Sequence, residues 1–306
     1  MANQVKSKSI WARSTTGDRS FYIICIIWLG IAGLSVLYPL IYVVACSFSS
    51  VRAILQGKVF LWPVDFSLSA YKAVYNYPLL KSGFLNSLFY VSGGTVVAVS
   101  LIVLAAYPIS RKDLPFRKFF QAFFLITMFF SGGMIPSYLL MRNLGLIGSR
   151  WALVVGVGFS CYYMIIVKTY FSSSLPLEIL DAAHIDGCGD IRFFFTIALP
   201  LAVPVIAVII LFEAVGIWNS YMSGMLYLTK PITFNFQMIL RDILFVAQMP
   251  AEILAQMDSD RIENMQNILQ QLRYAVLVIG ALPMMILYPF IQKYFIRGMM
   301  LGSLKG

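Results

Sequence analysis

The fold class is decided by residues 21–48, which read FYIICIIWLGIAGLSVLYPLIYVVACSF and contain no charged side chain. An α-helix needs about 20 consecutive apolar residues to cross the hydrocarbon core of a bilayer. This stretch is longer than that, so it predicts a helix that spans a membrane. It also exceeds the roughly 7–15 apolar residues of a cleavable signal peptide, which we therefore do not expect here.

The composition of the whole chain agrees with this stretch. Of the 306 residues, 60% are hydrophobic and 12% are charged, whereas a soluble domain has about 25% charged residues. The net charge of +10 does not indicate nucleic-acid binding, because the basic residues flank apolar stretches instead of forming one face. Four singly spaced cysteines and a single histidine, His184, argue against a disulfide scaffold and a metal site.

Further uncharged stretches predict an all-α integral membrane protein with six transmembrane helices. Lys and Arg are densest before the first span, in the short link between the second and third spans, and after the last span. By the positive-inside rule, both termini are expected to be cytoplasmic. We expect a cytoplasmic segment at 1–20 and a transmembrane domain at 21–306, with spans at about 21–48, 84–110, 119–141, 151–171, 196–218 and 274–296, an inner loop at 172–195 and an outer loop at 219–273.

The predicted outer loop contains an amphipathic stretch at residues 236–248. Apolar side chains recur there at helical spacing. Two interpretations stay open: a helix lying on the outer membrane surface, and a helix that contacts a partner. The apolar residues are Phe236, Ile239, Leu240, Ile243 and Leu244.

The predicted inner loop begins with a short helix. Residues 172–190 read SSSLPLEILDAAHIDGCGD. The serines offer a cap, Pro176 suits a first helical turn, and Glu178 complements the positive end of the helix dipole. The helix is expected to end at about His184 or Ile185.

A glycine turn follows this helix. We expect Gly187 and Gly189 to adopt positive φ and to reverse the chain, and Asp190 to cap the next helix. Ala182 and Ala183 keep the first helix narrow. Two short helices joined in this way form a knob that fits a groove on a soluble partner, and His184 is expected to be a solvated or interface side chain on it.

The spacing of residues in this loop resembles the EAA loop of the permeases of ABC importers. The pattern is Asp181-Ala182-Ala183, three residues, Gly187, nine residues, and then Ile197-Ala198-Leu199-Pro200. The family has Glu where Asp181 stands, so the acid is shorter here but keeps its charge. Other stretches resemble the carbohydrate branch of this family, including Tyr38-Pro39-Leu40, SGGMIP at 131–136, Trp218-Asn219-Ser220 and YPFIQKYF at 288–295.

The resemblance implies a type I importer permease similar to the smaller permease subunit of maltose-type systems. Its expected partners are a second, different permease, two ATPase subunits that bind ATP and Mg, an extracellular sugar-binding protein and membrane lipid, with no nucleic acid. The location implied is the bacterial cytoplasmic membrane, and the cargo implied is a carbohydrate, foremost an oligosaccharide. The ATPase-coupling residues implied are Glu178, Asp181, Ala182, Ala183, Gly187, Ile197, Leu199 and Pro200, and residues 249–260 are expected to contact the binding protein unless they are a surface connector.

No catalytic residue or cofactor is expected in this chain. It lacks the Gly-x-x-x-x-Gly-Lys-Ser/Thr loop that cradles nucleotide phosphates, so ATP hydrolysis is expected on partner subunits. Two alternatives stay open, an importer permease for a non-sugar solute and a secondary transporter. The second is disfavoured because no convincing inverted repeat is visible.

One acidic residue stands inside the fifth predicted span. Glu213 is costly there unless it faces a cavity or a partner. Trp218, Asn219 and Tyr221 follow at the expected outer mouth. These four residues form a candidate substrate path, and the alternative for Glu213 is a structural hydrogen bond to a neighbouring span.

Overall fold

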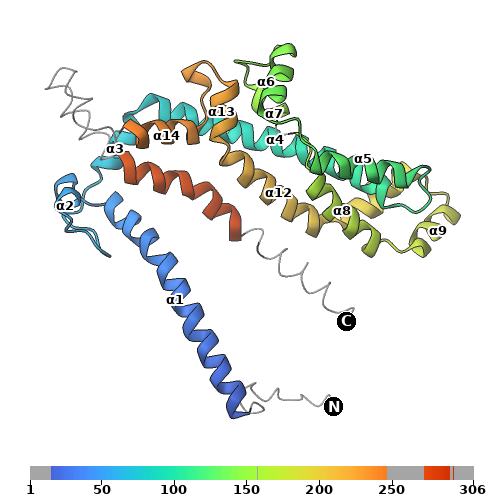
Figure 1. Cartoon of the computed structure of the whole chain (residues 1–306), viewed down its shortest axis with the longest axis horizontal. Coiled ribbons are helices and arrows are strands. Elements are labelled where there is room, and N and C mark those ends of the chain that lie inside the picture. Colours follow the sequence, from blue (N-terminus) through green and yellow to red (C-terminus); the bar gives the residue numbers. More distant parts are fainter. Residues whose placement is uncertain (1–14, 157, 247–271, 290–291, 293–306) are drawn as a thin grey trace.

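All regular structure in the described part of the chain is helical. The computed structural model describes residues 15–156, 158–246, 272–289 and 292, and no strand occurs within them. The elements, shown in Figure 1, are α1 (Thr16–Ser47), α2 (Val51–Leu55), α3 (Ser69–Asn76), α4 (Pro78–Ser110), α5 (Arg117–Phe129), α6 (Met134–Asn143), α7 (Trp151–Val155), α8 (Cys161–Ser174), α9 (Leu177–Ile185), α10 (Asp190–Phe193), the π-helical turn η2 (Phe194–Ala198), α11 (Leu199–Leu201), α12 (Val203–Trp218), α13 (Tyr221–Tyr227), the 3₁₀ turn η3 (Pro231–Thr233), α14 (Phe236–Val246) and a last helix, Leu272–Pro289.

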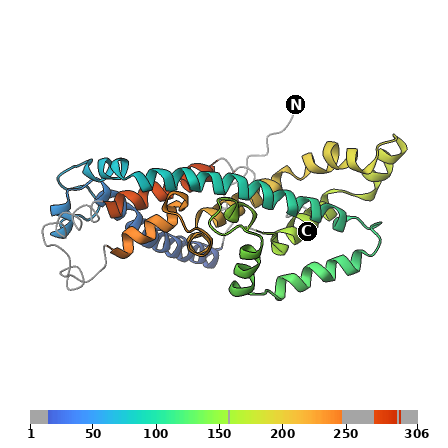
Figure 2. The same cartoon turned by 90° about the horizontal axis from the view of Figure 1, so that it is seen from above.

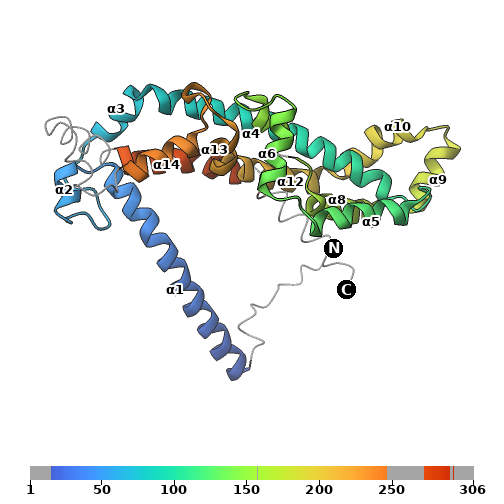
Figure 3. The same ribbon diagram turned by 45° about the horizontal axis from the view of Figure 1, so that its top comes forward.

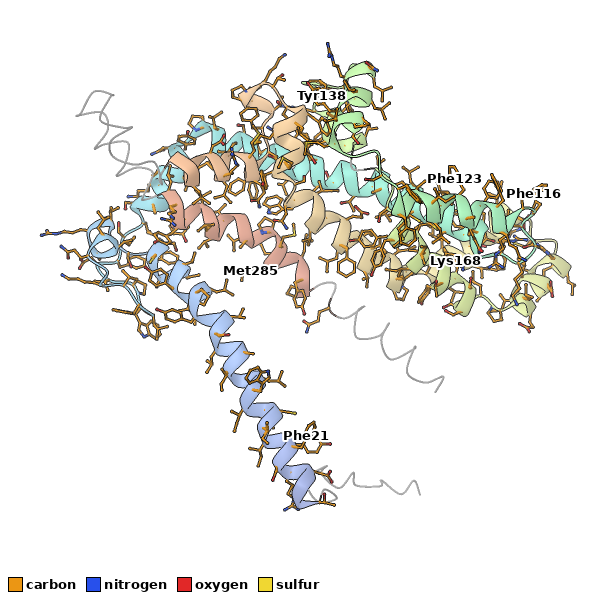
Figure 4. The ribbon with its side chains drawn as sticks, viewed as in Figure 1. Phe21, Phe116, Phe123, Tyr138, Lys168 and Met285 are labelled. Carbon is orange, nitrogen blue, oxygen red and sulfur yellow. The ribbon has the colours of Figure 1, made fainter. Side chains whose placement is uncertain are left out.

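Helix α1 stands apart from the other helices (Figure 1). Its 32 residues give a length of about 48 Å. It begins at a reciprocal cap, in which the Thr15 hydroxyl accepts from the Asp18 backbone N–H and the Asp18 carboxylate accepts from the Thr15 N–H at 3.0 Å. The most apolar window of the helix is 0% buried, and Phe21 is among its exposed side chains (Figure 4). Lipid or another protein must therefore cover it.

Helix α4 is the scaffold on which most other helices pack. It runs along the length of the molecule in Figure 2, and α8 and α12 lie against it. Ala98 and Ala106 on α4 are fully buried, because small side chains let neighbouring helices approach closely. The first core cluster joins α4 to α8, η2 and α12, and its members include Ile102, Val103, Met164, Val167, Phe171, Phe193, Phe194, Ala198 and Ile209.

A second core cluster lies at the other end of α4. There the apolar face of α14 packs against α4 and the helix Leu272–Pro289. The apolar face of α14 is therefore covered by helices of this chain, while the two interpretations of where the helix lies, on the membrane surface or against a partner, stay predictions. The cluster consists of Leu80, Trp218, Phe236, Ile239, Leu240, Ile243, Leu272 and Val276.

Two of the predicted spans are bent. Helices α5 and α6 meet at 109°, across a break that contains Gly133 with φ +82°, a conformation that glycine adopts readily. The segment Asp190–Leu201 meets α12 at 75°, close to Pro200 and Pro204. Proline removes a helical hydrogen bond and is a common cause of such kinks. The bounds predicted for these two spans gave no sign of either bend.

Three helices in the described residues are long and apolar enough to cross a membrane, and the number rises to five if each bent pair forms one span. The predicted span at 151–171 is divided into α7 and α8. Residues 293–296 of the last predicted span lie outside the described residues. The count of six spans stays a prediction.

Hydrogen bonds of the Asn235 side chain connect the start of α13 to α14. Its side chain is buried, its amide donates to the Ser220 carbonyl at 3.0 Å, and its carbonyl accepts from the Met238 N–H at 3.2 Å. Replacing Asn235 by Ala leaves both partners unpaired, which costs about 1–3 kcal/mol. We expect Asn235→Ala to lower the unfolding temperature of the detergent-solubilised protein, whereas Gln237→Ala, at a half-buried neighbour whose amide donates one 3.5 Å hydrogen bond to Asn219, lowers it less. Equal unfolding temperatures for the two variants would contradict this role.

Candidate functional site

Helix α9 carries the first part of the loop that the sequence singled out. Pro176 occupies its N-cap position without a side-chain cap, and Glu178 lies in its first turn. The serines 172–174 belong to the end of α8, so the expectation that they cap α9 was wrong. Glu178, Asp181 and Ala182 are exposed, while Ala183 is buried in the first core cluster. The helix thus has one face on the core and one face free.

The turn after α9 depends on Gly187. Its φ is +72°, and its N–H donates to the His184 carbonyl at 3.0 Å while the Cys188 N–H donates to the Ala183 carbonyl at 2.9 Å. Gly189 has φ −73°, so the expectation of positive φ there was wrong. One left-handed residue is sufficient to reverse the chain.

Arg111, at the end of α4, forms an ion pair with the start of α10. Its guanidinium forms ion pairs with Asp113 and with Asp190, and the His184 ring lies 3.4 Å from the same Asp190 carboxylate. Asp190 is the first residue of α10 and its side chain makes no cap, which corrects the capping role expected for it. These contacts attach the loop to the end of the scaffold helix.

The contact between Arg111, Asp113 and Asp190 shifts the pKa of all three side chains. Hydrogen bonding to Arg111 lowers the pKa of Asp190 and the pKa of Asp113, and hydrogen bonding to Asp113, followed by the contact with Asp190, raises the pKa of Arg111. All three groups therefore stay charged at neutral pH. The sequence analysis used Arg111 only as a topology signal and missed this contact, since Arg111 and Asp190 are 79 positions apart.

The end of the sequence motif enters the core. Ile197, in η2, and Leu199, in α11, pack against the first core cluster, while Pro200 is exposed beside the 75° bend. The motif residues therefore fall into two groups, an exposed face on α9 and an anchor before α12. Figure 3 shows α9 and α10 projecting at one end of the molecule.

Glu213 lies on α12 beside a separate cavity of about 240 Å³. The residue is only 8% exposed, and no hydrogen bond or ion pair joins its carboxylate to another described residue. The structural hydrogen bond considered as its alternative role is thus absent from the described residues. The cavity is lined by Ala152, Leu153, Gly156, Glu213, Gly216, Ile217, Ser220, Ser223 and Tyr227.

The other three candidate path residues do not line this cavity. Trp218 is 1% exposed in the second core cluster, and its indole N–H donates to the Gly280 carbonyl at 2.9 Å. Asn219 donates to the Val215 carbonyl at 3.0 Å, and Tyr221 is on the exposed surface. The sequence analysis missed Ser223 and Tyr227, although their spacing from Ser220 marks one face of a helix. The predicted binding-protein contact at 249–260 lies outside the described residues.

Comparison with known proteins identifies the family. The model of the family described as "Binding-protein-dependent transport system inner membrane component" matches residues 9–301. The chain belongs to this family. It is therefore a multi-pass membrane subunit of a transport system and not itself an enzyme.

Relatives of this transport subunit match it over nearly their full lengths. Protein LplC of Bacillus subtilis is 36% identical over 96% of this chain and 97% of its own. The polygalacturonan/rhamnogalacturonan transport system permease protein YtcP of the same organism is 39% identical over 88% and 92%. A solved chain from a bacterial ABC transporter involved in the import of the acidic polysaccharide alginate has a TM-score of 0.83 at 33% identity, covering 92% of this chain and 99% of that one.

Gly187 offers a matched test of the turn. A β-branched residue at φ +72° is strained by about 1–2 kcal/mol, whereas Gly189 has an extended conformation with open space where a Cβ would stand. We expect Gly187→Val to lower the stimulation of ATP hydrolysis by the binding protein in the assembled transporter and Gly189→Val to leave it near the wild-type level. Normal stimulation and transport in Gly187→Val would exclude a role of the turn in coupling.

The Arg111 contact predicts a pH effect. The pKa of Asp190 is lowered from 3.8 in the folded state, so the stabilisation is complete above about pH 4 and is lost as the pH falls through the lowered value. We expect Arg111→Gln to speed hydrogen exchange of the α9–α10 amides at neutral pH, and wild type to show the same change only in acid. Lys112→Gln, next in sequence, is the control. Equal exchange in wild type and Arg111→Gln at neutral pH would contradict the contact.

Proposed function

We propose that this chain is a permease subunit of an ATP-driven importer that moves a carbohydrate, foremost an oligosaccharide, across the bacterial cytoplasmic membrane. An extracellular binding protein delivers the cargo. Two ATPase subunits supply the energy, with ATP and Mg bound on them. Both termini of this chain and the α9–α10 loop face the cytoplasm.

The observation that supports this proposal is the extent of the similarity. The matches to YtcP and to the alginate importer chain cover at least 88% of both partners in each comparison. The descriptions of these two proteins concern polysaccharides, and the melibiose/raffinose/stachyose import permease protein MelC of Bacillus subtilis, at 27% identity over 80% of this chain, is named for smaller sugars. Similarity along the whole chain favours the same class of cargo.

The α9–α10 loop supports the ATPase role. Its exposed acids, Glu178 and Asp181, and the small residue Ala182 present a narrow polar surface. Behind that surface, Ala183 packs in the core and Arg111 holds Asp190. A surface that is anchored on two sides transmits the movement of a bound partner as a rigid body. We propose that the ATPase binds this surface.

The uncovered helix α1 supports a second permease as a partner. A window that is 0% buried in a 32-residue apolar helix leaves its interactions to lipid or to another membrane protein. Exposed apolar residues also line α5, where Phe123 is 53% exposed (Figure 4). A pore formed by two different permeases, with lipid around them, accounts for both surfaces.

Reconstitution tests the proposed function. The chain is co-expressed with a candidate second permease and ATPase, assembled in liposomes, and supplied with the binding protein and a panel of sugars: maltotriose, galactotriose, raffinose and trigalacturonate. We expect uptake of at least one sugar that needs both internal ATP and the binding protein. Uptake driven by an ion gradient without ATP, or no uptake of any sugar, would contradict the proposal.

A further inference from the structure

The cavity beside Glu213 holds an acidic group that the rest of the described chain leaves without a partner. An acid inside a membrane span costs about 2.5–3.5 kcal/mol on insertion scales and almost always faces a cavity or a binding partner. Glu213 is more than nine-tenths buried, and the described chain offers it no hydrogen bond. Its carboxylate is thus available to hydrogen-bond donors that enter the cavity.

The walls of the cavity leave room for more than water. Its volume of about 240 Å³ far exceeds the ~10–15 Å³ that a single water requires. Gly216, one turn from Glu213 on the same lining, has nothing within 4 Å of the place where a Cβ would stand. The floor of the cavity is therefore open enough for a small, rigid ligand group.

The polar groups around this space suit a ligand rich in hydroxyls. A carboxylate accepts hydrogen bonds through two oxygens and donates none when ionised, so it complements two neighbouring hydroxyls on one sugar ring. Ser223 and Tyr227, on α13, add hydroxyls that donate or accept, while the Ser220 hydroxyl already donates to the Ile217 carbonyl at 2.6 Å. Apolar Leu153 and Ile217 complete the lining.

The charge also sets what the cavity rejects. A uronate group placed beside Glu213 brings two carboxylates together in a site of low dielectric constant, where like charges repel strongly. An uncharged sugar has no such cost. Two of the similar proteins are named for an acidic polysaccharide or for polygalacturonan. A preference for uncharged units at this cavity would therefore distinguish the cargo of this chain from theirs.

We propose that the cavity beside Glu213 binds one uncharged, hydroxyl-bearing sugar unit of the cargo, with the Glu213 side chain as hydrogen-bond acceptor, and that it disfavours a uronate unit. The proposal rests on the proposed function of carbohydrate import. It adds a binding site in this subunit and a charge preference at that site.

The experiment uses the complete importer in liposomes with its binding protein. Glu213→Ala removes the acceptor, Glu213→Gln keeps the shape and one acceptor oxygen, and Ile210→Ala alters the same helix at a residue that is 40% exposed and outside the cavity lining. The probes are maltotriose, galactotriose and raffinose as neutral sugars, and trigalacturonate with its methyl ester as a pair that differs in charge.

We expect Glu213→Ala to reduce uptake of the neutral sugars at least tenfold without loss of complex assembly, Glu213→Gln to reduce it a few-fold, and Ile210→Ala to leave it unchanged. Trigalacturonate is expected to gain relative to its methyl ester in Glu213→Gln.

Three results would overturn the inference while the proposed function stands. The first is wild-type uptake of neutral sugars by Glu213→Ala. The second is loss of assembly in both Glu213 variants, which would assign the carboxylate to a contact with the partner permease. The third is a wild-type importer that takes up trigalacturonate and none of the neutral sugars or the methyl ester. Failure of the wild type to take up any probe would instead refute the proposed function.

Discussion

The packing of α8 and α12 against α4 is the constraint on which the rest of the structure depends. The three helices share the first core cluster, in which Ala106 of α4 is completely covered. Since a bilayer supplies no hydrophobic drive for helices to associate, close contact between small residues and well-fitted side chains holds such helices together. Both candidate functional regions are attached to this three-helix unit, the α9–α10 loop at one end and the Glu213 cavity further along α12.

This arrangement connects the loop with the cavity through two physical links. One is the ion pair between Arg111 at the end of α4 and Asp190 at the start of α10. The other is the covalent path through η2 and α11, whose residues Ile197 and Leu199 pack on the core, into α12 and on to Glu213. The 75° bend between these segments lies on the second link. The loop is therefore attached both to α4 and to α12, and α12 lines the cavity.

The sequence predicted the local features of the loop well. A short helix that ends at Ile185 and a left-handed Gly187 depend on local propensities, which neighbouring residues determine. The errors concern contacts over long distances. Asp190 was expected to cap a helix and instead pairs with Arg111, 79 positions away, and Trp218 was expected at a substrate path but donates to the Gly280 carbonyl in the core. In both cases the partner of the side chain comes from a segment far away in the sequence.

The sequence by itself determined that the chain is a helical membrane protein and that the segment of α9 and α10 has a specific spacing of residues, because hydrophobicity and spacing are properties of neighbouring residues. The tertiary structure alone decided where the helices bend, which helices cover the apolar face of α14, and that Glu213 shares a cavity with Ser223 and Tyr227. These features arise where segments far apart in the chain meet. Their energies come from close packing and from the pairing of buried polar groups, which no local pattern of residues encodes.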